Sequence, residues 1–312
     1  MSISPLSEIQ KKRVAMLQKQ LTRACSAGEL ETAKKILVDL KPIYLDTGNN
    51  ARFYISSLRY YESVMDHGDK NIALLGIKGI RERSNKNTRV HLEASTLLAI
   101  CYLRIGAFDL SEPVIKEVLK NDKVITSSKK RAEYRKEIIS RFDEEALIAG
   151  LSETNPVKMT LKDVENQIID NIGKHEDELY ENIGVAVPEN AKNILLRIDM
   201  FSKKQLPTAE RIALPSGQEV VENKKVGKRI QRFISRSLYN SFCNKDSEIY
   251  KSMISGNLTN LNTIITTAII ETFYKFSIGI SALIGVVAAT IIKHGIDYIC
   301  SISKPKNLID YR

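Results

Sequence analysis

Six basic residues recur at helical spacing in the last third of the chain, and their chemistry suits phosphate groups. They are Lys224, Lys225, Lys228, Arg229, Arg232 and Arg236. Apolar residues between them, from Ile230 to Leu238, recur at complementary positions, so we expect an amphipathic helix with a basic face. Such a helix can lie on an anionic lipid surface or bind nucleic-acid phosphates. It can equally be a surface helix that packs its apolar side on the protein.

An uncharged, apolar run follows closer to the C-terminus, over residues 276–292. As one helix it would be about 25 Å long, at the short end of what crosses the hydrocarbon core of a membrane. Small residues fall at every fourth position of this run: Ser277, Ser281, Gly285 and Ala289. Helices approach each other closely in lipid through such spacing. We expect a C-terminal helix that meets a membrane or a second copy, and the alternative is a hairpin buried in a soluble domain.

Catalytic and metal-binding patterns are missing from the sequence. It contains no GxxxxGK(S/T) phosphate loop, no GxGxxG, no HExxH and no GxSxG. The four histidines are scattered, and the acidic residues between His175 and Glu181 are mostly consecutive, so they cannot share one helical face. We therefore expect no catalytic residue, no metal site and no cofactor, and we predict that the chain is not an enzyme.

The charge of the chain is unevenly distributed. The formal net charge is +10, which favours an anionic partner. Residues 151–200 are nevertheless net acidic, between two basic regions. The chain therefore does not encode one uniformly basic nucleic-acid surface, and nucleic acid is the less favoured partner.

The cysteines and the N-terminus indicate a cytosolic body. Cys25, Cys101, Cys243 and Cys300 lie far apart with no CxxC spacing, so we expect reduced thiols. Charged residues interrupt every apolar run within the first 25 residues, so no signal-peptide core is present there. The expected location is the cytoplasm, with membrane association through the C-terminal helix.

Three segments of the N-terminal half align on a glycine that is followed, five residues later, by a small residue. The pairs are Gly28 and Ala33, Gly68 and Ala73, and Gly106 and Ser111. The glycines are about 40 and 38 residues apart, which is the range of helical-hairpin repeats. The glycine would end one helix, and the small residue would let the next helix pack closely on it. Neither helix can bury its apolar face alone, so neighbouring hairpins are expected to stack.

The third unit resembles a tetratricopeptide repeat through Leu98, Ala99, Tyr102, Gly106, Phe108 and Ser111. The resemblance extends over roughly residues 15–122. The spacing is longer than the 34 residues of that family, and its tryptophan and closing proline are absent. The resemblance implies a concave face that binds a peptide or protein segment. A helical bundle without repeats is the alternative, and both are all-α.

We expect four regions: a repeat domain at 1–150, an acidic helical region at 151–202, a hinge or small hairpin at 203–222, and the basic and apolar helices at 223–312. The predicted function is a protein-binding scaffold or effector, including a membrane-acting defence effector, whose tail associates with a membrane or with itself. The alternative is a soluble homo-oligomeric assembly subunit with the apolar tail buried at an interface.

Overall fold

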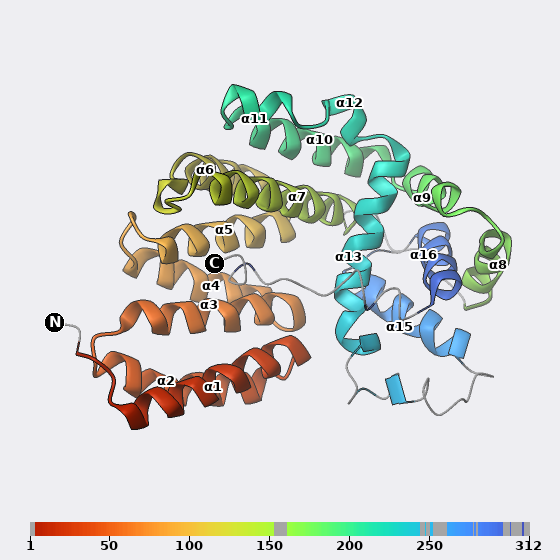
Figure 1. The fold of residues 1–312 in the computed structure, drawn as a ribbon. Helices are drawn as coiled ribbons and strands as arrows, with labels where there is room; N and C mark the ends of the chain where they lie inside the picture. The colour runs from red at the N-terminus through yellow and green to blue at the C-terminus, as the bar shows by residue number, and fades with distance from the viewer. Residues whose placement is uncertain are drawn as a thin grey trace. The chain divides into compact units, whose positions relative to one another are not determined.

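The computed structural model describes residues 4–152, 161–243, 247, 250–251, 261–276, 278, 280–295, 300 and 308. Every regular element among these residues is a helix (Figure 1), so the predicted all-α fold is confirmed. The chain divides into two compact units. The first comprises Met1–Ile138 with Lys306–Arg312, and the second comprises Ile139–Pro305.

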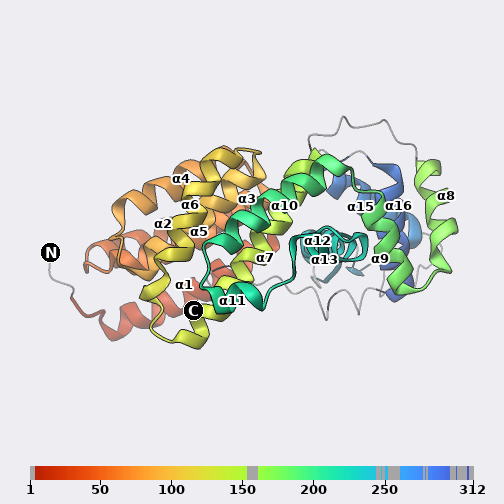
Figure 2. The same ribbon diagram turned by 90° about the horizontal axis from the view of Figure 1, so that it is seen from above.

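The first unit is a stack of three helical hairpins. Its elements are α1 (Glu8–Ala27), α2 (Leu30–Leu45), α3 (Asn50–His67), α4 (Lys70–Arg83), α5 (Arg89–Arg104), α6 (Phe108–Lys120), the short η1 (Asp122–Val124) and the beginning of α7 (Ser128–Ser152). From α1 to α6, each helix packs on the next in sequence, and α3 also packs on both α1 and α5 (Figures 1 and 2). The helices α1, α3 and α5 therefore form a continuous layer, as neighbouring hairpins must do to bury their apolar faces.

Local sequence signals define where these helices begin and end. Ser7 and Gln10 form a reciprocal capping box at the start of α1, and Asp69 accepts a hydrogen bond from the N–H of Asn71 at the start of α4. Gly28 ends α1 with a φ of 72°, in the left-handed region that favours glycine. These signals are local, and the structure shows them at the turns of the first two hairpins.

The six aligned repeat residues lie at equivalent places in the three hairpins. Gly106 has a φ of 74° beyond the end of α5, whereas Gly68 ends α3 with an extended backbone. Ala33, Ala73 and Ser111 are each fully buried, in α2, α4 and α6 respectively. The small residue thus lies in the second helix of each hairpin, where a larger side chain would have no space.

The second unit surrounds α13 with helices from both sides of the sequence. It contains the end of α7, α8 (Leu161–Ile172), α9 (Glu176–Val185), α10 (Glu189–Lys204), α11 (Thr208–Ile212), α12 (Gly217–Val220), α13 (Asn223–Cys243), α15 (Leu261–Lys275) and α16 (Ser281–His294). α13 packs on α9 and α15, and α16 packs on α8, α9 and α15. One apolar core joins these helices, and in it the rings of Phe233 and Phe276 meet edge to face at 4.8 Å.

The segment expected as a hinge or small hairpin contains two short helices, α11 and α12. Ser216 accepts a hydrogen bond from the N–H of Glu219, and the Glu219 carboxylate accepts one from the N–H of Ser216. This capping box begins α12 within the segment for which a small hairpin was the alternative.

The apolar C-terminal run forms a shorter helix than expected. α16 starts at Ser281 and has 14 residues, and the preceding α15 ends at Lys275. Among the described residues, no helix combines the length and apolar character needed to cross a membrane. The predicted transmembrane helix is therefore not supported.

The small-residue ladder packs inside the second unit. A side chain built at Gly285 would place its Cβ 2.2 Å from the Cβ of Gln167 on α8. Ala289 is fully buried, Ser281 is half-buried, and Ser277 lies outside the described residues. Gly285 therefore brings α16 close to α8 of the same chain, which corrects the expectation of a seam exposed to lipid or to a second copy.

The expectation of four reduced thiols was also wrong. Cys243, at the end of α13, forms a disulfide with Cys300. Cys25 and Cys101 are free and buried. The disulfide pairs residues 57 positions apart, a distance at which sequence spacing gives no signal for pairing.

Candidate functional site

The first unit carries a buried carboxylate that binds a main-chain group. Glu62 lies on α3 and is only 6% exposed. The backbone N–H of Leu308 donates to both of its carboxylate oxygens, at 3.0 Å to Oε1 and 3.2 Å to Oε2. Leu308 is itself only 5% exposed. The stack therefore holds an N–H group and an apolar side chain from a point of the chain far from α3.

Contacts of α3 with both neighbouring hairpins position Glu62. The hydroxyl of Ser63 donates to the carbonyl of Cys25 at 2.9 Å, which ties α3 to the end of α1. On the other side, Arg104 of α5 donates to the carbonyl of Met65 at 2.9 Å and to the carboxylate of Asp66 at 2.6 Å. The turn of α3 that follows Glu62 is therefore held by hydrogen bonds to α1 and α5.

Two charged residues of α3 also act on the thiol of Cys25. Burial raises the pKa of Cys25 to about 12, the charge of Arg59 lowers it, and the charge of Glu62 raises it. Arg59 and Glu62 therefore both lie close to the end of α1. The Cys25 thiol is therefore protonated at neutral pH and is a poor nucleophile.

A second buried acid lies on the next helix of the same layer. Glu93 of α5 is fully buried and pairs with Arg89 at 2.9 Å. The guanidinium of Arg89 lies 4.8 Å from the ring centroid of Tyr134, whose hydroxyl lies 2.8 Å from that of Thr96. Burial raises the pKa of Tyr134. Glu93 is thus matched by a cation of its own helix.

The basic residues at the start of α13 are paired with acids of the same unit. Lys224 lies 2.7 Å from Asp177, and its hydrogen bond lowers the pKa of that carboxyl. Lys225 lies 3.2 Å from Glu219 and 3.5 Å from Glu222. These side chains are exposed to water, which screens each pair, so the pairs contribute little to stability.

The remaining bases of α13 also have partners, and its apolar side is covered. Lys228 lies 5.3 Å from the ring centroid of Tyr180. Arg236 pairs with the buried Glu144 of α7, and Arg232, which is 58% exposed, lies 3.8 Å from Glu144. The apolar residues between the bases, Ile230, Phe233, Ile234 and Leu238, are buried in the core. The helix therefore packs on its own unit, as the third sequence alternative held, and the apolar face expected to meet lipid is not exposed.

A buried charge cluster lies beside α13. Arg229 donates to the carbonyl of Val220 at 3.0 Å and lies 3.4 Å from Asp143, while Lys203 lies 2.7 Å from Asp199. Burial and the charge of Asp199 raise the pKa of Asp143, although Arg229 and Lys203 lower it. The pKa of Asp199 is raised as well, first by burial. Two carboxyls and two cations thus share one low-dielectric site, and the carboxyls are harder to ionise than in water.

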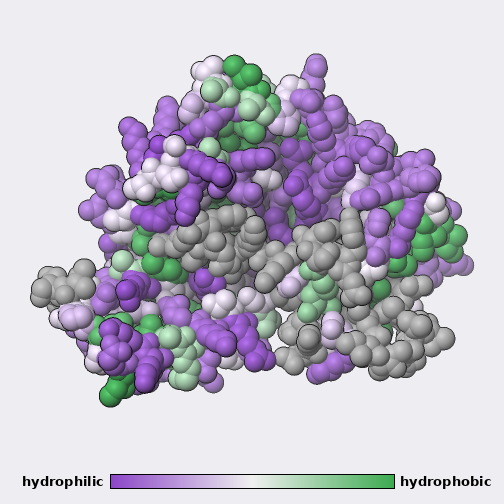
Figure 3. Space-filling model, in the orientation of Figure 1, coloured by the Kyte–Doolittle hydropathy of each residue, from purple (hydrophilic) through white to green (hydrophobic). Residues whose placement is uncertain are grey.

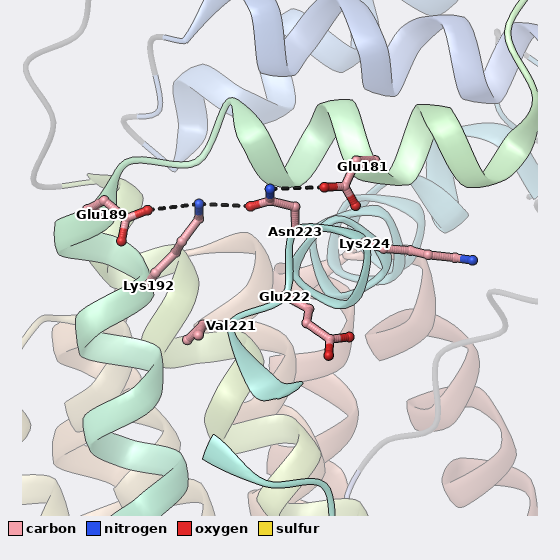
Figure 4. Close-up of a pocket in the computed structure, with 7 residues that line it drawn as sticks. All are labelled: Glu181, Glu189, Lys192, Val221, Glu222, Asn223 and Lys224. Carbon is pink, nitrogen blue, oxygen red and sulfur yellow. Dashed lines mark hydrogen bonds and ion pairs between the residues drawn. The ribbon is translucent and has the colours of Figure 1, made fainter. Parts of the chain in front are cut away.

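A pocket of about 610 Å³ opens near the start of α13 (Figure 4). Its lining residues are Glu181, Glu189, Lys192, Val221, Glu222, Asn223 and Lys224. Lys192 donates to Glu189 and to Asn223, both at 3.0 Å, and Asn223 donates to Glu181 at 3.0 Å. Ligand pockets are mostly apolar with a few polar groups. This one is lined mainly by charged side chains bonded to each other, and the bonds fix the start of α13 against α9 and α10.

The surface of the described residues in the view of Figure 3 is mostly hydrophilic. Green areas lie over α11 and α8. Ile212 of α11 is 77% exposed, and Ile169 of α8 is 72% exposed. Single exposed apolar residues are normal on soluble proteins, so these positions alone define no binding surface.

Three residues with a role in the structure were not singled out in the sequence: Glu62, and the glycines Gly184 and Gly227, at which α9 and α13 approach closely. Glu62 follows the apolar Leu58 at helical spacing, so an acid on a buried face was the available signal. Gly184 and Gly227 lie inside helices, where glycine is unfavourable without a packing reason. Among the described residues, no group of three or more histidine, cysteine or acidic residues could hold a metal ion.

No protein-family model, curated protein or solved structure matches the chain.

Proposed function

We propose that the chain is a non-enzymatic scaffold whose first unit binds an extended segment of a protein. The observation that supports this proposal most strongly is the hydrogen bonding of the Leu308 N–H to both oxygens of Glu62. A carboxylate that accepts a main-chain N–H recognises the backbone of a segment, independently of its side chains. The adjacent burial of Leu308 adds a preference for an apolar side chain.

The stacked hairpins agree with this use. Repeat stacks present a continuous layer of first helices, and extended segments bind along such layers. The similarity of the third hairpin to a tetratricopeptide repeat favours the same class of ligand. The proposal involves the first unit alone, because the basic helix and the small-residue ladder are packed within the second unit.

Selection of peptides from a random library would test the proposal. The full chain and its Leu308→Asp variant would each serve as bait, because the variant should vacate the site. Selected peptides should bind at least about tenfold more weakly once Glu62→Gln is introduced, since a charge-assisted hydrogen bond becomes a neutral one. The control is Glu82→Gln, which alters an exposed acid of α4. Peptides that bind equally with and without Glu62→Gln, or no selected peptides on either bait, would refute the proposal.

A further inference from the structure

Exposed basic residues gather in the first unit where α4 connects to α5 and where α6 connects to α7. Residues 116–136 contain eight lysines and arginines against three acids, a formal net charge of +5, which is half of the +10 of the whole chain. The exposed bases of the two connections, which we call the basic edge, are Arg83, Lys86, Lys120, Lys123, Lys129 and Lys130.

Ion pairs inside the unit link the two connections and occupy the acid nearest to both. Glu117 of α6 lies 2.6 Å from Arg81 at the end of α4 and 3.1 Å from His91 at the start of α5. The carboxylate of Glu117 is therefore engaged by its own unit, and it leaves the charge of the basic edge in place.

The other acids of this region do not neutralise the basic edge either. Asp122 is buried and pairs with Arg135. Glu82 and Glu133 are exposed, but they are outnumbered by the exposed bases around them. Within the part of the chain that the structure describes, none of the six residues of the basic edge takes part in an ion pair. Their charges are available to an anionic partner.

Hydroxyl groups lie among the lysines. The three residues 126–128 are threonine and serines, and all three are exposed. The hydroxyl of Ser127 accepts a hydrogen bond from the N–H of Lys130 at 3.3 Å, in the first turn of α7. Lysines together with serine and threonine hydroxyls are the groups that contact the phosphates of nucleic acids. The basic edge thus offers both charge and hydrogen bonds to a row of phosphates.

The residue types favour a duplex over other anionic partners. No large apolar side chain is exposed within residues 81–89 or 116–136, so this surface has nothing to insert into lipid. Tyr134 is the one aromatic residue of these two ranges and is buried, so single-stranded bases cannot stack on it. Lysines bind phosphates as point charges without a fixed geometry, which suits a regular backbone and reads no bases.

We propose that the basic edge binds the phosphate backbone of double-stranded nucleic acid without reading its sequence. This surface is separate from the Glu62 site, and it would let the scaffold hold a protein segment beside a duplex. Release of counterions drives such binding, so the affinity falls steeply with salt. With about five lysine–phosphate contacts, the logarithm of the binding constant should fall against the logarithm of the salt concentration with a slope of about −4.5.

Fluorescence anisotropy of a short labelled DNA duplex of arbitrary sequence would test the proposal, with the full chain at about 50–200 mM salt. The edge variant carries Lys120→Glu, Lys123→Glu and Lys129→Glu together. We expect it to bind at least about thirtyfold more weakly than the unaltered chain, with a salt slope less negative by about 3. Circular dichroism would confirm that its helices are retained.

The matched control carries Lys34→Glu, Lys35→Glu and Lys41→Glu together, at exposed positions of α2. Its net charge equals that of the edge variant. Because salt screens charges that lie away from the bound duplex, the control should bind within about threefold of the unaltered chain.

Two other polyanions identify the class of partner. Polyglutamate, and vesicles of phosphatidylserine and phosphatidylcholine at about 1:4, would be compared with the duplex at equal concentrations of negative charge. We expect the unaltered chain to bind the duplex most tightly, and the edge variant to lose this advantage.

Four results would overturn the proposal. They are equal loss of duplex binding in the edge variant and the control, no duplex binding at about 50 mM salt, a salt slope of the unaltered chain shallower than about −2, and tighter edge-dependent binding of vesicles or polyglutamate than of the duplex. The last result would assign the basic edge to lipid or to an acidic protein. Binding of peptides through Glu62 is measured separately, so these results leave the proposed function of the first unit intact.

Discussion

Replacing Gly227 by alanine should severely destabilise the second unit. Gly227 lies within α13, and a Cβ built there falls 1.9 Å from the carbonyl oxygen of Tyr180 on α9. The approach is reciprocal, because a Cβ at Gly184 of α9 falls 1.9 Å from the carbonyl oxygen of Asn223. The two helices thus cross backbone against backbone, and no flexible side chain can move aside to make room.

The expected cost follows from this geometry. A Cβ needs about 3.4 Å from an oxygen, so the helices must separate by more than about 1 Å. Leu179, Ile183, Val226 and Ile230 are fully buried in the surrounding core and would lose contacts. Overpacking of this kind costs about 1–3 kcal/mol or more, and alanine recovers only about 1 kcal/mol through its better helix propensity. Because the clash is with backbone atoms, the upper end of that range applies, and about 3 kcal/mol less about 1 kcal/mol leaves a net loss of about 2 kcal/mol.

Thermal unfolding followed by circular dichroism at 222 nm would measure the effect, since the chain contains no tryptophan for fluorescence. A loss of about 2 kcal/mol lowers Tm by about 4–8 °C for a unit of this size. The control is Gly79→Ala in α4, where a built Cβ meets nothing within 4 Å. It should stabilise the first unit by about 0.5–1 kcal/mol. A Gly227→Ala chain as stable as the unaltered one would refute the close crossing of α9 and α13.

Three further predictions concern the second unit. Cys243→Ser should lower its stability by up to about 4 kcal/mol in urea unfolding, because the lost disulfide closes a loop of 57 residues, and reductant should affect the unaltered chain but not the variant. If reductant has no effect on the unaltered chain, Cys243 is not paired with Cys300. Burial in the folded state raises the pKa of Asp143 above its ordinary value of 3.8, so the folded state binds this proton more strongly than the unfolded state. The free energy of unfolding should therefore fall as pH rises from about 4 through the raised pKa. Asp143→Asn should flatten that slope in urea titrations at several pH values, and an unchanged slope would assign the titration to another group. Gly285→Ile should destabilise the second unit by about 1–3 kcal/mol through overpacking against α8, and its Tm should fall accordingly. An unchanged Tm would mean that the Gly285 face of α16 does not pack on α8.

The sequence alone predicted the helices and much of the hairpin stack. Spacing of apolar residues, capping residues and turn glycines are signals within a few residues of one another, and they act on the local backbone. Gly28 and Gly106 were predicted to end helices and Ala33 was predicted to be buried, in each case from residues within one hairpin, and the structure has them so. Such windows suffice for the ends and turns of the helices because caps and turn glycines act through contacts within one hairpin.

The same kind of local pattern led to wrong expectations for the helices of the C-terminal half. The bases of α13 and the small residues of α16 are typical of membrane-associated helices, but a similar pattern arises when a helix packs on acidic or closely approaching neighbours. Glu144 of α7 lies beside Arg236, and Gln167 of α8 lies beside Gly285. Which partner a helix face meets depends on contacts across a hundred residues or so, and periodicity carries no information about them.

The candidate site depended entirely on tertiary structure. The sequence by itself determined that the chain is helical, and it indicated glycine-aligned hairpins in the first half, with a helical bundle without repeats as the alternative. Only the tertiary structure paired Glu62 with Leu308, Cys243 with Cys300 and Arg229 with Asp143. These pairs join residues 57 to 246 positions apart. The physical reason is that a helix fixes only the directions of its side chains, whereas a long-range pair forms only when the packing of whole helices brings two such faces within bonding distance.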